Sequence, residues 1–266
     1  MIYLSYFLIY AIIFIFGAII GSFLNVCILR LPTGESIVEG GSHCMSCKAK
    51  IKKYDLIPIV SYIILRGKCR SCGAKISPRY MVVELLNALL YVFTFYWFGL
   101  TEASLESAMV CVVLSCLIIV FFMDMDTQLI NMPVVAVIII MAIAKLVLTL
   151  TNVLMPVNPF SWKSALIGAL VISIPFLLIF LISKGRALGF GDVALMFAGG
   201  AFLGVKAVII AAFIGLITGS VAGLITKYRS GNSRFAFGPW LSLGIGSAIF
   251  FGDRLADLYL KISGLQ

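Results

Sequence analysis

The chain has 266 residues; 62% of them are apolar, only 12% are charged, and its mean hydropathy is +1.14. This composition excludes an ordinary soluble domain and indicates an integral membrane protein embedded in a lipid bilayer. The net charge of +9 predicts no nucleic-acid partner, because the basic residues follow the pattern of a membrane topology.

Apolar stretches of about 20 residues recur along the chain, and each approaches the length that a helix needs to cross a bilayer core of roughly 30 Å. The first stretch lacks a basic N-terminal region and a small-residue cleavage pattern, so we expect a retained helix and no signal peptide. The sequence therefore predicts an all-α polytopic membrane protein with about eight transmembrane helices. The stretches lie at residues 3–24, 82–98, 108–123, 132–150, 164–182, 190–205, 207–226 and 237–252.

The basic residues are distributed unevenly between the two sides of this arrangement. Fifteen of the 20 Lys and Arg residues fall in the segments 30–80, 183–189 and 227–236. Cytoplasmic loops collect Lys and Arg, so we assign these segments to the cytoplasm. The N-terminus is then outside, the segment 30–80 is inside, and both chain ends lie on the same face. The basic inner segment is also suited to contact anionic lipid.

Four cysteines form two Cys-x-x-Cys pairs in the segment 30–80: Cys44 with Cys47, and Cys69 with Cys72, with 21 residues between the pairs. Four thiolates suit tetrahedral zinc, which stabilises a segment too short to bury a core of its own. Two disulfides are the alternative, but the cytoplasm is reducing. His43 is a substitute ligand in principle, although we expect it at the surface. Zinc bound by four cysteines has no open position, so its role should be structural.

Four of the 11 acidic residues are expected at the inner membrane boundary: Glu84, Asp124, Asp126 and Asp192. Ionisable groups are costly at such depth, which makes each a functional candidate. Asp192 opens an apolar run, where an acid can simply cap a helix. Two acids at one depth favour a different interpretation. Two carboxylates that share one proton can activate a water and protonate a leaving group, as in aspartic peptidases.

The surroundings of the two aspartates predict different roles. Asp192 faces the positive end of its helix, which favours the ionised form and the role of base. Asp124 follows the negative end of its helix, which favours the protonated form and the role of acid. Gly189 and Gly191 flank this site without side chains, so an extended peptide backbone is expected to approach Asp192 closely.

Three stretches together resemble the type 4 prepilin peptidases. They are "GSFLNVCILRLP" (21–32), "IPIVSYIILRGKCRSCGAKISPRYMVVE" (57–84) and "GFGD" (189–192). The resemblance implies a multi-pass enzyme of the bacterial inner membrane that cleaves prepilins or pseudopilins, in pilus assembly or protein secretion, on the cytoplasmic side. Many members of that family then methylate the new N-terminus with S-adenosylmethionine.

The resemblance also implies roles for particular residues. The aspartate of the Gly-x-Gly-Asp motif corresponds to Asp192. The partner aspartate begins a motif of the form Asp-x-x-x-x-x-Ile/Leu-Pro-Asp/Asn, and this chain has "DMDTQLINMP" with the proline displaced to Pro133. Asp124 begins the motif and is the expected partner, with Asp126 in reserve.

The methyltransferase activity rests on the resemblance alone, since no Gly-rich nucleotide loop is present. Polar residues near the cytoplasmic segment are candidates for the cofactor or the substrate, and they serve equally well as interfacial anchors and packing partners. They are Arg30, Tyr62, Arg79 and Glu84.

The expected organisation has three parts: a first transmembrane helix (1–29), a zinc-ribbon-like loop domain that is the candidate methyltransferase part (30–80), and a transmembrane aspartic peptidase domain (81–266). A peptidase without methyltransferase activity is the alternative. An ion-coupled transporter is disfavoured, because no acid lies at the middle of a predicted helix. A zinc-ribbon scaffold without a reaction leaves the boundary acids unexplained.

Overall fold

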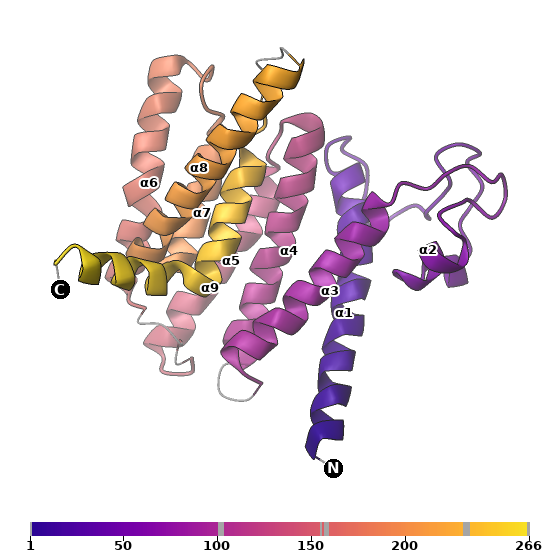
Figure 1. The fold of residues 1–266 in the computed structure, drawn as a ribbon, viewed down its shortest axis with the longest axis horizontal. Helices are drawn as coiled ribbons and strands as arrows, with labels where there is room; N and C mark the ends of the chain where they lie inside the picture. Colours follow the sequence, from indigo (N-terminus) through magenta and orange to yellow (C-terminus); the bar gives the residue numbers. More distant parts are fainter. Residues whose placement is uncertain (1, 101–103, 155, 157–159, 231–234, 265–266) are drawn as a thin grey trace. The chain divides into compact units, whose positions relative to one another are not determined.

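The computed structural model describes residues 2–100, 104–154, 156, 160–230 and 235–264, so the basic segment 227–236 is described only in part. These residues form helices joined by loops, and no strand occurs among them beyond two isolated β-bridges. The prediction of an all-α polytopic membrane protein is confirmed. The helices are α1 (Ile2–Arg30), the 3-10 helix η1 (Lys53–Leu56), α2 (Val60–Ile64), α3 (Arg79–Phe98), α4 (Ser104–Thr127), α5 (Met132–Leu150), α6 (Trp162–Ser183), α7 (Phe190–Leu203), α8 (Val205–Ser230) and α9 (Gly238–Ile262) (Figure 1).

Each of the eight predicted apolar stretches corresponds to one long helix or to α7. Six helices of the described chain are long and apolar enough to cross a membrane: α1, α3, α4, α5, α6 and α8. The helix α7 has 14 residues and is about 21 Å long, which is shorter than a bilayer core. The apolar pattern thus predicted where the helices lie, and it did not predict that one of them is too short to span alone.

The structure divides into two compact units, Met1–Tyr96 and Trp97–Gln266, and the division falls near the end of α3. In the first unit α1 and α3 run side by side (Figure 1). Gly17 lies so close to the backbone of Ala88 that a Cβ there would be 2.8 Å from the Ala88 Cα. The Asn87 side chain donates to the Gly17 carbonyl over 2.7 Å. Small residues and a buried amide therefore hold this pair together, as is common between membrane helices.

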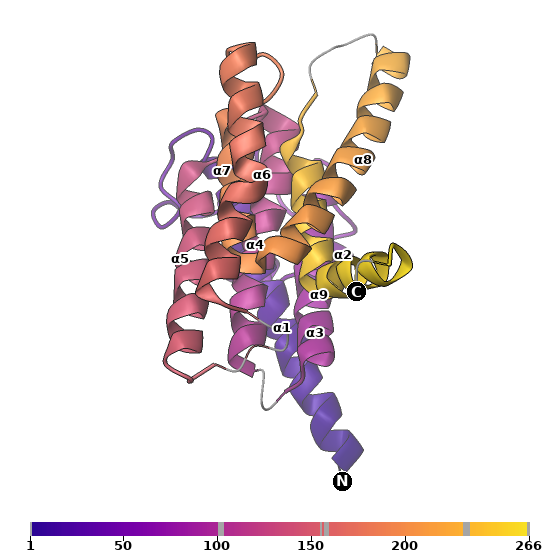
Figure 2. The same cartoon turned by 90° about the vertical axis from the view of Figure 1, so that its left-hand side faces the viewer.

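In the second unit α4 is the most buried of the candidate membrane spans. It packs against α5 and α9, and the short helix α7 contacts α5, α6, α8 and α9. The backbones of α6 and α7 pack directly at Gly168 and Gly200, where no side chain separates them. Figure 2 shows the second unit's helices from another side. The short α7 therefore has neighbours on several sides, and Asp192 and Val193 of its first turn are buried whereas Phe190 is exposed.

The helix α9 changes direction along its length (Figures 1 and 2). The predicted apolar stretch 237–252 covers only its first part. Beyond it, charged residues alternate with apolar ones, and Asp257 pairs with Lys206 of α8 over 2.7 Å. This pattern is typical of a helix segment that lies along a membrane surface.

Candidate active site

Asp124 lies in the last turn of α4 and is 5% exposed. Its Oδ2 atom accepts a hydrogen bond of 2.9 Å from the backbone N–H of Gly238, at the start of α9. The loop between α4 and α5 turns back at Gln128, which has a positive φ of 56° and donates its N–H to the Asp124 carbonyl. The carboxylate is therefore buried between the end of one helix and the beginning of another.

Asp192 lies in the first turn of α7 and is 7% exposed. Its Oδ2 atom accepts a hydrogen bond of 3.0 Å from the backbone N–H of Gly189, so the side chain does cap its helix. Ile130 lies against Gly191, the neighbour of Asp192, and against Gly238, the partner of Asp124, so the two aspartates are close together. Capping and pairing are therefore compatible, and the structure brings these two carboxylates into one buried site.

Asp126 is exposed, unlike Asp124. Two residues along an α-helix turn a side chain by about 200°, so both aspartates cannot face the same neighbour. Asp126 is thus directed away from the site that contains Asp124.

Ile130 lies beside two glycines of this site, Gly191 and Gly238. A Cβ at Gly191 would be 2.7 Å from the Ile130 Cβ, and a Cβ at Gly238 would be 2.9 Å from the Ile130 Cδ1. The space next to Gly191 is therefore filled by an isoleucine of the α4–α5 loop. Gly189 differs, because a Cβ there would meet the Asp192 Oδ2 at 3.3 Å. The glycines thus allow close packing of this chain's own residues.

Sequence reasoning missed Gly238 and Ile130 as parts of the site. The signal for Gly238 was weak: a Gly-Pro pair, Gly238–Pro239, where an apolar helix begins. Ile130 occupies the Ile/Leu position of the motif that begins at Asp124, but that position alone does not show which glycines it contacts. Both contacts join segments far apart in the chain.

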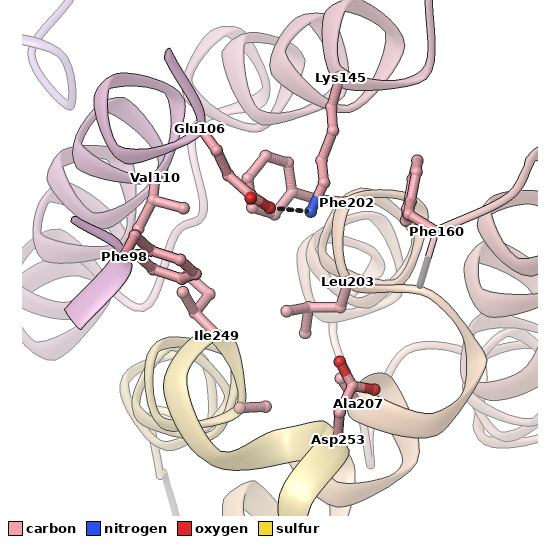
Figure 3. A pocket seen from close by; sticks show the side chains of 11 residues that line it. Phe98, Glu106, Val110, Lys145, Phe160, Phe202, Leu203, Ala207, Ile249 and Asp253 are labelled. Carbon is pink, nitrogen blue, oxygen red and sulfur yellow. Dashed lines mark ion pairs between the residues drawn. The ribbon is translucent and has the colours of Figure 1, made fainter. Parts of the chain in front are cut away.

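A second buried polar cluster lies at the other end of α4, about 27 Å along the helix from Asp124. Lys145 of α5 pairs with Glu106 of α4 over 3.0 Å, and both side chains are buried. The Lys145 ammonium also lies 4.7 Å and 4.8 Å from the ring centres of Phe160 and Phe202. Figure 3 shows Asp253 on the far side of the same cavity. The cavity of about 20 Å³ has room for one water molecule, so this cluster is a structural ion pair and no substrate pocket.

The four cysteines of the loop form a cluster that can bind a metal ion. The sulfur atoms of Cys44, Cys47, Cys69 and Cys72 all lie within 4.8 Å of one another, and all seven cysteines of the chain are free. The sulfurs of Cys44 and Cys72 are 3.9 Å apart, close to the roughly 3.8 Å expected between thiolates around tetrahedral zinc. The donor set therefore fits zinc, and disulfides are not formed.

The two cysteine pairs have the same local structure. "CMSCKAKI" (44–51) and "CRSCGAKI" (69–76) differ at two positions. In each, the first cysteine donates its N–H to the alanine five residues on, Ala49 or Ala74, at 2.9 and 2.8 Å. Backbone N–H groups of Cys47 and Ser46 also lower the pKa of the Cys44 thiol to about 6. Such turns present thiolates to a metal ion.

His43 does not belong to the cysteine cluster. It pairs through its backbone with Lys50, and its Nδ1 lies 3.5 Å from the Gly41 carbonyl. The four cysteines are sufficient without it.

Arg30 and Glu84, two of the four cofactor candidates, make short hydrogen bonds to the backbone of the loop segment. The guanidinium of Arg30 donates to the carbonyl groups of Ser36, Glu39 and Gly40 at 2.8 to 3.0 Å. The buried Glu84 accepts the N–H of Ile59 over 2.7 Å. Ile59 has a φ of 64°, a conformation that is costly for a β-branched residue. Arg30 and Glu84 therefore hold the loop domain in place.

The other two candidates lie elsewhere in the first unit. Tyr62 lines a hollow of about 450 Å³ whose wall also includes Arg66, Lys68 and Lys75. Arg79 is half-buried at the start of α3 and does not line that hollow. The structure thus separates the four candidates into two packing residues, one residue at a basic hollow, and one at a helix start.

These features define a class: a polytopic membrane protein with two buried aspartates at helix ends and a four-cysteine metal-binding loop. Residues 15–98 match the bacterial peptidase A24 N-terminal domain, and residues 111–224 match the type IV leader peptidase family. The chain belongs to the type IV leader peptidase family.

Several curated relatives carry the name "Prepilin leader peptidase/N-methyltransferase". The protein from Bacillus subtilis (strain 168) is 32% identical, over 95% of this chain and 98% of its own length. The protein from Xanthomonas campestris pv. campestris is 31% identical over 94% of both chains, and that from Neisseria gonorrhoeae is 31% identical over 86% of both. No solved structure matches the chain.

Proposed function

We propose that this chain is a membrane-embedded aspartic endopeptidase that cleaves the basic leader of type 4 prepilins or pseudopilins at the cytoplasmic face. The main support for this proposal is the buried pair of Asp124 and Asp192. Each carboxylate accepts a hydrogen bond from a backbone N–H at the start of a helix. The names of the relatives supply the substrate class. Of the two aspartates at the end of α4, the buried Asp124 is the catalytic one in this proposal and the exposed Asp126 is not.

The two carboxylates have complementary roles in the proton transfers of peptide hydrolysis. The ionised carboxylate takes a proton from a water molecule, and the resulting hydroxide forms a bond with the scissile carbonyl carbon. The protonated carboxylic acid gives its proton to the leaving nitrogen as the C–N bond breaks. Burial suits this reaction, because it disfavours two negative charges at one site and so favours a state in which the two carboxylates hold one proton between them.

Ile130 occupies space that the substrate would need in order to reach Asp192. Its side chain lies against Gly191, on the side from which an extended peptide would reach Asp192. We infer that the loop carrying Ile130 shifts when the substrate binds. Residues 128–131 lie between α4 and α5 and are not part of either helix, which leaves this loop freer to move than the helices.

The charge pattern supports an inner-membrane orientation with the N-terminus outside and the cleavage site inside. Fifteen of the 20 basic residues belong to the segments assigned to the cytoplasm. A prepilin presents a basic leader before a long apolar segment, so its cleavage junction would meet the enzyme at this boundary.

We also propose that the four-cysteine cluster binds structural zinc and that the loop domain 30–80 provides the methyltransferase part beside a peptidase domain 81–266. The sulfur spacing supports the metal. The hollow at Tyr62 supports S-adenosylmethionine, because its volume suits a small molecule and Arg66, Lys68 and Lys75 suit the cofactor's carboxylate. Bound there, the cofactor would supply a methyl group to the new N-terminal amine.

One experiment tests the proposal as a whole. The purified full chain is incubated with a prepilin-like peptide and methyl-labelled S-adenosylmethionine, and the products are measured by mass spectrometry. Cleavage after the leader together with an added methyl group supports both activities. Cleavage without methylation supports a peptidase alone, and an intact peptide contradicts the proposed function.

A further inference from the structure

The first residue of α9 is in direct contact with one of the two aspartates. Gly238 and Pro239 begin this helix, and both are buried. The first N–H groups of a helix have no acceptor inside the helix. The N–H of Gly238 instead donates to the Oδ2 atom of Asp124 over 2.9 Å, in a bond that joins residues 114 positions apart.

This bond changes the electrostatic surroundings expected for Asp124. The carboxylate lies near the negative end of α4, its own helix, but it also faces the positive end of α9. Asp192 has a similar arrangement, since Gly189 donates to it at the start of α7. Each aspartate thus accepts a hydrogen bond from a backbone N–H at a helix N-terminus. A backbone N–H does not titrate and cannot rotate away as a side chain can.

The contact leaves no space for a side chain at position 238. A Cβ there would lie 2.8 Å from the Asp124 Oδ2 and 2.9 Å from the Ile130 Cδ1. Both distances are shorter than real Cβ contacts, so an alanine would displace the carboxylate, the isoleucine, or both. Pro239 fixes the backbone that follows, which limits how far α9 can yield.

We propose that Gly238 is a positioning residue for the cleavage reaction: its N–H orients the Asp124 carboxylate, and its missing side chain lets α9 approach that closely. Gly238 does not touch the substrate in this proposal. The inference rests on the proposed peptidase function, because it assigns a role within that site.

The test compares cleavage of a prepilin-like peptide by the wild-type chain and by Gly238→Ala, both full-length and in the same detergent. Gly238→Ala should lower kcat by roughly ten- to a hundredfold, as expected for a misplaced catalytic group. KM should change much less than kcat, because Gly238 itself does not touch the substrate in this proposal. Gly246→Ala is the matched control in the same helix: a Cβ there meets nothing closer than 3.8 Å, so kcat and KM should not change.

A double variant separates positioning from packing. Ile130→Val removes the Cδ1 atom that an alanine at position 238 would strike, but it leaves the contact with Asp124 in place. If positioning matters, Gly238→Ala with Ile130→Val remains as slow as Gly238→Ala alone. Recovery of the wild-type kcat in this double variant would overturn the inference, and so would a Gly238→Ala chain with wild-type kcat.

Failure of the Gly238→Ala chain to fold would also test the proposed contact between Gly238 and Asp124. If Gly238→Ala cannot be purified, the same substitution is made in a chain that carries both Asp124→Ala and Ile130→Val, where the atoms that the new Cβ would meet most closely are absent. Recovery of folded protein supports the contact, and failure in both backgrounds contradicts it. If the wild-type chain does not cleave the peptide, the proposed peptidase function fails. If the wild-type chain cleaves it and Gly238→Ala cleaves it equally fast, only the role of Gly238 fails.

Discussion

Glu84 illustrates how a buried acid can be explained by its contacts. From the sequence alone it is a candidate for cofactor or substrate binding, with packing as the alternative. In the structure its Oε2 atom accepts the N–H of Ile59, a residue with a positive φ of 64°, and the Ser22 side chain forms a hydrogen bond with the same carboxylate. These contacts favour the packing role, because they connect α1, α3 and the loop domain through one carboxylate.

Glu84→Ala should therefore loosen the loop domain. Loss of a hydrogen bond to a charged group costs about 1.5–3 kcal/mol, and the strained Ile59 loses the partner that holds it. Limited trypsin digestion should cut the loop at its Lys and Arg residues faster than in the wild-type chain. Glu35→Ala, at an exposed position of the same segment, is the control and should behave as wild type. Equal digestion rates for both variants would contradict the packing role.

The residues of the candidate site differ in how far the sequence could predict them. Asp192 and Asp124 stand out because a carboxylate at an apolar boundary needs an explanation. Gly238 and Ile130 do not stand out, because a glycine and an isoleucine are ordinary in membrane helices. They matter because they lie where α4, α7 and α9 come close together, and short-range sequence patterns do not predict which helices are close.

At the scale of elements, the ion pair between α4 and α5 stabilises the second unit. Lys145 and Glu106 are both buried, and two aromatic rings enclose the ammonium group (Figure 3). A buried charge without its partner is strongly unfavourable. Lys145 lies in the predicted apolar stretch 132–150, and Glu106 lies just before the stretch 108–123. The sequence does not show that they pair, because the pairing depends on how α4 and α5 pack.

Lys145→Met should lower the free energy of unfolding of the second unit by about 3–5 kcal/mol, because it leaves the Glu106 charge without its ammonium partner. Adding Glu106→Gln should restore part of that loss. Lys206→Met, which breaks the exposed pair with Asp257, should cost only about 0–1 kcal/mol. The measurement is denaturant unfolding in detergent, and a similar loss for both lysines would refute the assignment.

The proposed zinc site should stabilise the loop domain. Each purified chain should carry one zinc ion by elemental analysis, and Cys47→Ser or Cys72→Ser should remove it. Cys27→Ala, in α1 and outside the cluster, should retain it. Chelation should expose the loop to trypsin, since binding free energy contributes to folding in such small domains. A full zinc content in Cys47→Ser would contradict the four-cysteine assignment.

At the scale of the whole molecule, the pattern of apolar and basic residues accounts for most of the fold. Positions of the long helices follow from apolar runs, because lipid demands helices of a fixed minimum length. The short α2 and η1 could not be predicted, because they are held by tertiary contacts such as that of Glu84 with Ile59. The end of α9 was also missed, since its charged residues interrupt the apolar run.

The basic segments predict the orientation of the chain in the membrane, and reporter fusions test this prediction directly. An alkaline phosphatase domain fused at the C-terminus should be active, because that enzyme matures only outside the cytoplasm, and the C-terminus is expected there. The same domain fused after Lys184 should be inactive. The reverse pattern of activities would invert the predicted topology and place the cleavage site on the outer face.

Asp124 and Asp192 are proposed to carry out the cleavage together. The most direct measurement is the rate at which purified Asp124→Asn, Asp192→Asn and Asp126→Asn chains cleave a prepilin-like peptide, with melting temperature as the check on folding. We predict that Asp124→Asn and Asp192→Asn each lose roughly 10²–10⁴-fold in rate, as expected when an acid or base is removed, while the exposed Asp126→Asn retains it. Full activity in either Asp124→Asn or Asp192→Asn, or loss in Asp126→Asn alone, would contradict the account.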